Sequence, residues 1–494
     1  MTATALVLFV FAIGADQPQW GAWGTRNMVS AETGLPESFD PASGKNVKWS
    51  VPTGTRTYGT PVVARGRVLV GTNNGAPRDP RHSTGNGDRG VLFCLDERDG
   101  KLLWQLVVPK REDDSAGDWP HTGICSPPTV EGDRAYLVTN LGEVVCLDLQ
   151  GQANGNDGPY KDEGRHMARP GAEPLEVTPL DADIIWIFDP RSALGVHQHD
   201  AAHGSVLLSG EFLYVCTSNG VAPTHRAMPT PEAPSVVALE KATGRLVATD
   251  AERIGTRMVH CTWSSPSSGD VAGRSLVFFG GGDGWCYAFE ALQGSPPEKP
   301  VALKTAWRFD CDPAGPKKDI YSFQGNKKES PSNITGMPVF DRGRVYVAAG
   351  GDYWHGKLEA WLKCIDASGS GDVTKSHEKW SYPLKRHVMA TPSVAGDLVF
   401  IADCGRMVHC IDRESGRAVW IHETKGDIWA STLVADGKLY IGTQRGDFWM
   451  LGASRELKVL GQVELESELD SSPVAANGTL YVATMSRLFA LERK

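Results

Sequence analysis

Histidine and acidic residues recur at comparable places in this chain, a few positions before short apolar segments that open with Ser, Thr or Pro. Neutral imidazole is a common ligand of transition metals, and protonated imidazole pairs with anions. Several such side chains around one point would form a metal site or a site for an anionic or aromatic ligand. The candidate ligand-binding residues are His121, His199, Asp200, His203, His260, Arg386, His387, Asp427, Trp429 and Asp470. We assign no catalytic residue and leave the identity of any metal open.

The densest part of this set lies between His197 and His203. Its spacing differs from the His-Glu-x-x-His motif of zinc peptidases, and the surrounding strands and loops do not supply the helix that this motif needs. The glycine-rich stretch 280–284 has no helix after it, so it is better explained as a hairpin turn than as a phosphate-binding loop. The alternative role for the histidines is structural, with each ring bonded to a main-chain carbonyl or to water.

The elements that position these residues belong to a repeat, which is clearest from Ala390 to Trp420. An inner strand begins at Thr391, an apolar β-type strand covers 398–402, and a third strand covers 407–412, with turn residues between them. A fourth strand ends at Trp420. Four antiparallel strands in about 30 residues make one propeller blade.

A turn glycine follows each predicted inner strand. These eight glycines are Gly66, Gly132, Gly210, Gly273, Gly343, Gly396, Gly437 and Gly478. Their number, and the last two spacings of about 41 residues, predict an all-β fold, an eight-bladed β-propeller of four-stranded antiparallel blades. Because the inner strands of a propeller begin at one mouth of the central channel, the candidate ligand-binding residues should surround that mouth.

The two ends of the repeat region are incomplete. Residues 472–491 supply three strands, and residues 46–50 look like a fourth strand with no blade in front of it. We expect this N-terminal strand to complete the last blade and close the ring, which hides two sheet edges. The expected division of the chain is a signal peptide at 1–15, an irregular N-terminal segment at 16–45 and the propeller at 46–494.

The blade ends carry a second repeated pattern, for which we predict a structural role. Its acidic residue can cap a turn, its glycine accepts the positive φ of that turn, and its tryptophan can pack between neighbouring sheets. The fullest copies contain Asp96, Gly100 and Trp104, and Asp412, Gly416 and Trp420.

The combined pattern of Ser/Thr-Pro, apolar strand, Ala/Cys-Leu-Asp, x-x-Gly-Lys/Arg and Trp resembles the pyrroloquinoline-quinone (PQQ) repeat. This repeat is found in quinoprotein alcohol dehydrogenases and in the propeller lipoprotein of the bacterial outer-membrane β-barrel assembly machinery. The resemblance runs from about Asn46 to the end of the chain and implies the propeller fold. It does not imply catalysis, because many proteins with this repeat bind no quinone.

Quinoprotein alcohol dehydrogenases share a pair of adjacent cysteines, a Ca²⁺ site and a catalytic Asp. No two cysteines are adjacent in this sequence, and no Cys-x-x-Cys-His run is present to attach haem. We therefore expect no cofactor and keep PQQ with Ca²⁺ as the alternative. Cys94, Cys146, Cys364 and Cys410 occupy a repeat position that holds Ala in other units, which is typical of small buried residues. Pairing among the other six cysteines stays open.

The N-terminus predicts export. An apolar core runs from Ala5 to Ile13, Ala15 ends a small-residue cleavage site, and Asp16 ends the apolar run too soon for a membrane span. We expect a periplasmic or secreted protein with no transmembrane anchor in the mature chain. The formal net charge of −9 and the pI near 5.8 disfavour a nucleic-acid partner.

These observations favour a non-catalytic binding or scaffolding propeller of the cell envelope, which presents its channel mouth and inserted loops to an envelope protein or a small ligand. The alternative is a quinone- or metal-dependent oxidoreductase that uses the histidine-rich mouth. An enzyme should bring the mouth residues together around one point. A scaffold should instead show an apolar patch on an outer or loop face.

Overall fold

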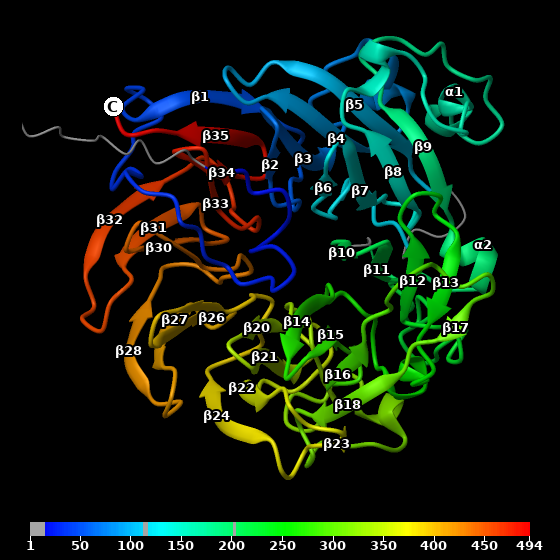
Figure 1. Ribbon diagram of the computed structural model, residues 1–494. Coiled ribbons are helices and arrows are strands. Elements are labelled where there is room, and N and C mark those ends of the chain that lie inside the picture. Colours follow the sequence, from blue (N-terminus) through cyan, green and yellow to red (C-terminus); the bar gives the residue numbers. More distant parts are fainter. Residues whose placement is uncertain (1–14, 112–116, 201–203) are drawn as a thin grey trace, which may run out of the picture.

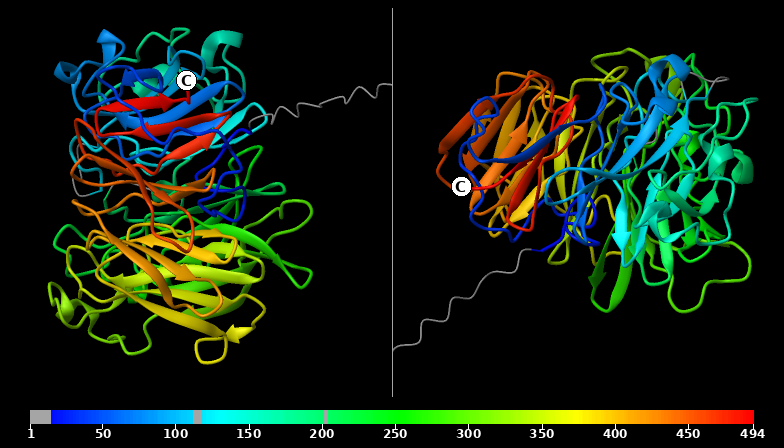
Figure 2. Two further views of the ribbon diagram at one scale, coloured as in Figure 1. Left: turned by 90° about the vertical axis from the view of Figure 1, so that its left-hand side faces the viewer. Right: turned by 90° about the horizontal axis from the view of Figure 1, so that it is seen from above.

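The computed structural model describes residues 15–111, 117–200 and 204–494. In these residues the chain forms eight small sheets of antiparallel strands that stand side by side in a ring (Figure 1). Figure 2 turns the ring edge-on and shows the strands crossing its thickness. The predicted eight-bladed β-propeller is confirmed. The predicted signal peptide lies, apart from Ala15, outside the described residues.

The first four blades contain the following strands from the channel outward. Blade 1 contains β2 (Val62–Ala64), β3 (Arg67–Asn73), β4 (Arg89–Asp96) and β5 (Leu102–Pro109). Blade 2 contains β6 (Thr129–Glu131), β7 (Arg134–Val138), β8 (Val144–Asp148) and β9 (Asp183–Phe188). Blade 3 contains β10 (Leu207–Ser209), β11 (Phe212–Cys216), β12 (Val236–Glu240), β13 (Leu246–Thr249) and β17 (Val301–Ala302). Blade 4 contains β14 (Ser267–Val271), β15 (Arg274–Gly280), β16 (Trp285–Glu290), β18 (Thr305–Asp310) and β23 (Gly371–Asp372).

The other four blades complete the ring. Blade 5 contains β19 (Ser332–Asn333), β20 (Val339–Asp341), β21 (Arg344–Gly351), β22 (Ala360–Asp366) and β24 (Glu378–Leu384). Blade 6 contains β25 (Ser393–Ala395), β26 (Leu398–Ala402), β27 (Met407–Asp412) and β28 (Ala418–Glu423). Blade 7 contains β29 (Leu433–Ala435), β30 (Lys438–Gly442), β31 (Asp447–Gly452) and β32 (Val459–Glu464). Blade 8 contains β33 (Val474–Ala476), β34 (Thr479–Ala483), β35 (Arg487–Leu491) and β1 (Val47–Pro52).

Helices are short and lie in connections. The two α-helices of the described residues are α1 (Glu163–Met167) and α2 (Pro190–Leu194), both at the outside of the ring (Figure 1). The 3-10 helices there are η1 (Pro80–His82), η2 (Thr84–Asn86), η3 (Gly151–Asn154), η4 (Ile254–Arg257) and η5 (Ile320–Phe323). None of the helices in this part of the chain has the length and apolar content needed to span a bilayer.

Three blades differ from the four-stranded expectation. In blade 5 the inner position is divided between β19 and β20, which both pair with β21. In blades 3 and 4 a lengthened turn from the following blade adds a short parallel strand to the outer edge, β17 on β13 and β23 on β18. These additions cover edges that would otherwise present unpaired main-chain groups.

The N-terminal strand closes the ring. β1 pairs antiparallel with β35, so the beginning and the end of the repeat region share blade 8. The predicted closure is therefore correct. Blade 8 is therefore held together by the pairing of β1 with β35, two strands that lie far apart in the chain.

Six tryptophans join neighbouring blades. The indole Nε1 of each donates to a main-chain carbonyl in the turn of the next blade, at 2.8 to 3.1 Å. The pairs are Trp49 with Glu97, Trp104 with Leu149, Trp186 with Lys241, Trp307 with Ala367, Trp380 with Arg413, and Trp420 with Ser454. Each indole thus fills the space between two sheets and satisfies a buried carbonyl.

The acidic residue and the glycine of the same repeat shape the turn that receives this indole. Asp412 Oδ1 accepts a hydrogen bond from the main-chain N–H of Ser415 at 2.9 Å, and Asp96 caps its turn in the same way. Gly416 has a φ of 65°, and a Cβ there would lie 2.5 Å from Cγ of Trp380. The glycine is needed both for the turn and for the close approach of the indole.

The segment before β1 forms a plug, here defined as residues 15–36. It contacts inner strands of all eight blades, through main-chain bonds to Val63, Val130, Ser268, Phe340 and Val434 and through side-chain bonds to Val206, Val394 and Ala475. At its centre Arg26 is fully buried and donates to the carbonyls of Trp20, Pro266, Ser205 and Val206 and to Ser205 Oγ. In Figure 1 this dark blue segment reaches toward the middle of the ring.

The plug fills the channel below the candidate site and extends to the hairpin face, while its Trp20 reaches the lining of the cavity at the other face. Inner strands begin at one face and reach their glycine hairpins at the other, where Glu32 of the plug accepts from the N–H of Gly478. The face where inner strands begin also receives the loops between second and third strands, because the strands alternate in direction. Long loops such as 217–235 and 352–359 therefore belong to the mouth face.

Candidate functional site

A cavity of about 540 Å³ lies at the mouth where the inner strands begin. Every blade contributes to its wall. The strand entrances supply Tyr58, Thr60, Thr122, Cys125, Pro127, Asp200, His260, Trp263, Thr335, Met389, Trp429, Asp470 and Ser472, the plug supplies Trp20, and longer loops supply Trp119, His225, Trp354 and His355. The cavity is thus built by the ring as a whole.

The structure brings several of the sequence-predicted residues together. Asp200, His260, Trp429 and Asp470 line the cavity, and the ring of His199 lies 5.0 Å from that of His260. His387 is buried behind this wall, with its ring 5.5 Å from that of Tyr353. His203 lies outside the described residues.

Other predicted residues lie elsewhere. The side chain of His121 is 73% exposed and lies 3.7 Å from Asp88, outside the cavity lining. Arg386 and Asp427 line a second, basic pocket of about 570 Å³. Its other members are Lys385, Gly405, Arg406, Lys425, Gly426, Gln444 and Arg445. The mouth therefore holds two separate chemical environments, one aromatic and one basic.

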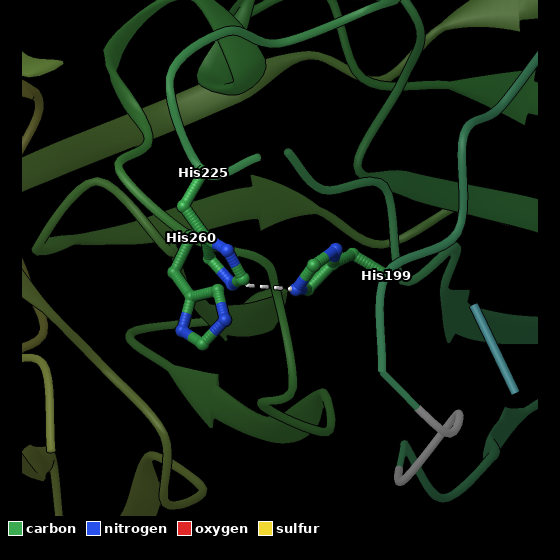
Figure 3. Close-up of side chains that lie close together, drawn as sticks. All are labelled: His199, His225 and His260. Carbon is green, nitrogen blue, oxygen red and sulfur yellow. Dashed lines mark hydrogen bonds between the residues drawn. The ribbon is translucent and has the colours of Figure 1, made fainter. Parts of the chain in front are cut away.

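Three imidazoles converge at the cavity wall (Figure 3). One ring nitrogen from each of His199, His225 and His260 lies within 4.8 Å of those of the other two. The Nε2 atoms of His199 and His225 are 3.0 Å apart. His199 precedes blade 3, His225 lies in the 217–235 loop of that blade, and His260 precedes blade 4. Two neighbouring blades and one inserted loop thus create the cluster.

Hydrogen bonds fix the tautomers of two of these rings. His260 Nδ1 lies 2.9 Å from Asp352 Oδ2, and His225 Nδ1 lies 3.1 Å from the carbonyl oxygen of Pro223. Both oxygens accept, so each Nδ1 carries the proton and Nε2 of the neutral ring carries a lone pair. Asp352 is held in turn by Asn333 Nδ2 at 3.1 Å and by the N–H groups of Trp354 and His355.

Asp200 approaches two of the three rings. Its carboxylate oxygens lie 3.6 Å from Nε2 of His260 and 3.8 Å from Nε2 of His199, and the indole of Trp119 donates to it. Asp200 has a φ of 58°, in the left-handed region that non-glycine residues rarely adopt. His225 shares this feature with a φ of 56°.

Burial keeps most of the cluster uncharged. Desolvation, with the neighbouring imidazoles, lowers the pKa of His199 to about 3, and desolvation likewise lowers the pKa of His355 to about 4. For His260, desolvation acts downward, but the hydrogen bond and charge of Asp352 outweigh it and raise the pKa. Desolvation raises the pKa of Asp200.

Aromatic rings form the rest of the wall. Trp354 lies at the centre, with ring centroids 5.7 Å from Trp263, 5.9 Å from Trp429 and 5.3 Å from Tyr353. Trp119 and Trp354 remain 45% and 43% exposed. Large aromatic faces are therefore open to a ligand in the cavity.

Sequence reasoning missed His225, Asp352, Trp354 and His355. They lie on loops between second and third strands, whereas the prediction considered strand entrances alone. A signal was present, since Asp352-Tyr353-Trp354-His355 stands between Gly351 and Gly356, and His225 lies between Gly210 and Gly273, where the repeat is longer than its last two spacings of about 41 residues. Four such residue types in one short loop are typical of a site on a rigid scaffold.

A family model described as "Outer membrane protein assembly factor BamB" matches residues 31–305 and 318–422. The chain belongs to this BamB family. Its repeat is the PQQ-like β-propeller repeat that the sequence pattern indicated. None of the curated proteins matches the sequence.

Solved structures share the fold of this BamB-family chain at low sequence identity. BamB from Moraxella catarrhalis is 13% identical with a TM-score of 0.52, over 90% of this chain and 96% of that one. A europium-containing methanol dehydrogenase is 13% identical with a TM-score of 0.56, over 95% and 89%. The quinohemoprotein alcohol dehydrogenase ADHIIG from Pseudomonas putida HK5 is 11% identical with a TM-score of 0.58, over 97% and 80%. A protein described as BamB and two alcohol dehydrogenases thus share this architecture, so the fold alone does not decide between their roles.

Proposed function

We propose that this BamB-family propeller is a binding protein of the cell envelope whose central cavity takes a small ligand with a flat apolar face. The observation that carries the proposal is the aromatic cavity assembled from all eight blades. Its volume of about 540 Å³ lies within the range of roughly 300–1,000 Å³ that small-molecule sites occupy. The plug supports the proposal because it makes the channel a pocket with one open end.

The exposed tryptophans support an aromatic or apolar ligand. Trp119 and Trp354 line the cavity with nearly half of their surfaces exposed to solvent. A ligand that covered these indoles would bury large apolar area. Concave apolar surfaces with a few convergent polar groups are typical of ligand sites. Asp200, Asp470 and the imidazoles would supply those polar contacts.

The residues of the cavity do not fit PQQ as the quinoprotein enzymes hold it. All ten cysteines are free and buried, and Cys125 is the one cysteine of the described cavity lining. No disulfide is therefore available to lie on a quinone ring. We derive no quinone step for this chain.

Binding of 1-anilinonaphthalene-8-sulfonate, a flat apolar dye, tests the proposal. We expect saturable binding at one site and at least 10-fold weaker binding after Trp354→Ala. Trp23→Ala is the matched control, because Trp23 is 46% exposed but is not part of the cavity lining. Equal dye affinity in all three proteins would reject the cavity as the binding site.

A protein-binding scaffold is the second candidate, favoured by the family match and by exposed apolar side chains on the outer strands of blades 6 and 7 or directly before them. These side chains are Ile421, Leu457, Val459 and Leu460, which are 38 to 53% exposed. Retention of envelope proteins by the immobilised chain, abolished by Ile421→Asp with Val459→Asp, would support this role. The family's outer-membrane role and the apolar N-terminal run support location in the envelope.

A further inference from the structure

We propose that His199, His225 and His260 bind one divalent transition-metal ion at the wall of the central cavity, with Asp200 completing the ligand set. This inference goes beyond the proposed ligand-binding function, since a cavity can take an apolar ligand without a metal. It rests on the positions of ring nitrogens, on their hydrogen-bond partners and on burial.

The positions of the three ring nitrogens suit coordination of one metal ion. Around a tetrahedral ion with metal–nitrogen bonds near 2.1 Å, ligand nitrogens stand roughly 3.4 Å apart. In the cluster, the nitrogens lie from 3.0 Å, between His199 and His225, up to 4.8 Å apart. Side-chain rotations that move ring nitrogens by about 1 Å would bring the separations close to those of a tetrahedral site.

The outer partners are those that metal-bound histidines use. A ligating imidazole usually donates its other N–H to a carboxylate or a carbonyl, which fixes the ring and raises its basicity. His260 donates to Asp352, and His225 donates to the carbonyl of Pro223. Asp352 is therefore a positioning residue, held in place by Asn333 and by two main-chain N–H groups.

The proton of the third imidazole, His199, must change its position when a metal ion binds. Because Nε2 of His225 carries a lone pair, the 3.0 Å contact requires His199 to donate from Nε2 in the metal-free protein. A bound cation would take the place of that proton, which would move to Nδ1 of His199, a buried ring nitrogen that makes no hydrogen bond in the described, metal-free protein. The ring stays neutral throughout, and Nε2 becomes the ligand atom.

Charge and burial favour a cation over an empty cluster. His199 is fully buried and His260 is 3% exposed, so the imidazoles cost desolvation that apolar side chains would avoid. The carboxylates of Asp200 and Asp352 both approach His260. Three imidazole nitrogens and one carboxylate are a ligand set for Zn²⁺ and other first-row divalent ions. The open side of the cluster faces the cavity, where a ligand of the proposed function would meet the ion.

Titration of chelator-treated protein with Co²⁺ tests the site, followed by visible absorption and by competition with Zn²⁺. We expect one equivalent to bind with ligand-field bands of nitrogen and oxygen coordination. His225→Ala and His260→Gln should each weaken binding at least 100-fold. Asp352→Asn should weaken it by 10- to 100-fold, as other outer-shell changes do.

His121→Ala is the matched control, because His121 is an exposed mouth histidine outside the cluster. It should bind Co²⁺ as the wild type does. Circular dichroism and melting temperature confirm folding, and His225 lies on a half-buried loop position whose truncation spares the core. No Co²⁺ bands in folded wild type, or unchanged affinity in His225→Ala, would overturn the proposal. Dye binding by the metal-free protein, measured separately, shows whether the ligand-binding function stands without the metal.

Discussion

At the scale of single residues, the repeat glycines and tryptophans act as pairs across blade junctions. Gly416→Ala places a Cβ 2.5 Å from Trp380 in a turn with a φ of 65°. We expect a loss of about 2–4 kcal/mol, from left-handed strain and overpacking together. Gly396→Ala is the control, since its φ is 61° but no atom lies within 4 Å of an added Cβ. Chemical denaturation should show a loss of about 1 kcal/mol there. Equal losses of unfolding free energy in the two variants would mean that the close contact with the Trp380 indole does not contribute to the effect.

Asp470 makes stability depend on pH. Desolvation raises its pKa from 3.8 to about 7, with Gln444 and Arg56 acting against the shift and Glu468 reinforcing it. The folded protein therefore binds more protons than the unfolded chain between these values, and stability falls as pH rises from about 4 to about 7. Asp470→Asn should abolish this loss and become the more stable protein near pH 8. The gain is at most a few kcal/mol, at about 1.4 kcal/mol per pKa unit less screening by water in the open cavity. Urea unfolding of both proteins at pH 4 and pH 8 measures it, and a pH-independent difference would contradict it.

At the scale of elements, the plug forms hydrogen bonds with inner strands of all eight blades beneath the cavity. Arg26 is its centre, and burial lowers its pKa to about 9. Arg26→Ala would leave four carbonyls without their guanidinium donor, and we expect a loss of about 3 kcal/mol or more. Arg65→Ala removes only an exposed ion pair with Asp133 and should cost less than about 1 kcal/mol. Thermal unfolding compares the two, and equal costs would mean that the plug does not stabilise the ring.

The difference between strands and loops also explains what the sequence could predict. Inner strands and their glycine hairpins repeat locally, so the blade number, the closing role of Val47–Pro52 and the positions of Asp200 and His260 followed from spacing. The loop that carries Trp354 joins a second and a third strand, and such loops differ in length and sequence among the blades, so the repeat does not predict which of their side chains reaches the cavity. Arg386 and Asp427 precede inner strands as His260 does, yet they line the basic pocket. A register of strands fixes which end of the channel a residue occupies, but side-chain packing decides which pocket it enters.

At the scale of the whole molecule, the first and last strands meet within blade 8, where β1 forms the outer edge beside the junction with blade 1. Trp49 of β1 docks across the junction between blades 8 and 1 onto Glu97. Trp186 docks across the junction of blades 2 and 3, and its own blade consists of four strands that are consecutive in the chain. Each Trp→Ala change should cost about 3–5 kcal/mol. We expect only Trp49→Ala to lose the single cooperative transition, because β1 can then separate from β35. Differential scanning calorimetry measures this as a calorimetric enthalpy above the van't Hoff enthalpy. A single cooperative transition in both variants would show that β1 does not separate from β35 before the rest of the ring unfolds.

The central claim is that the open end of the channel is a built binding site with a metal-binding wall. An anomalous difference map from crystals grown with Co²⁺ tests it most directly. The account predicts one strong peak within bonding distance of ring nitrogens of His199, His225 and His260, beside Asp200. A map with no peak at this cluster, in crystals that hold Co²⁺ elsewhere on the molecule, would contradict it.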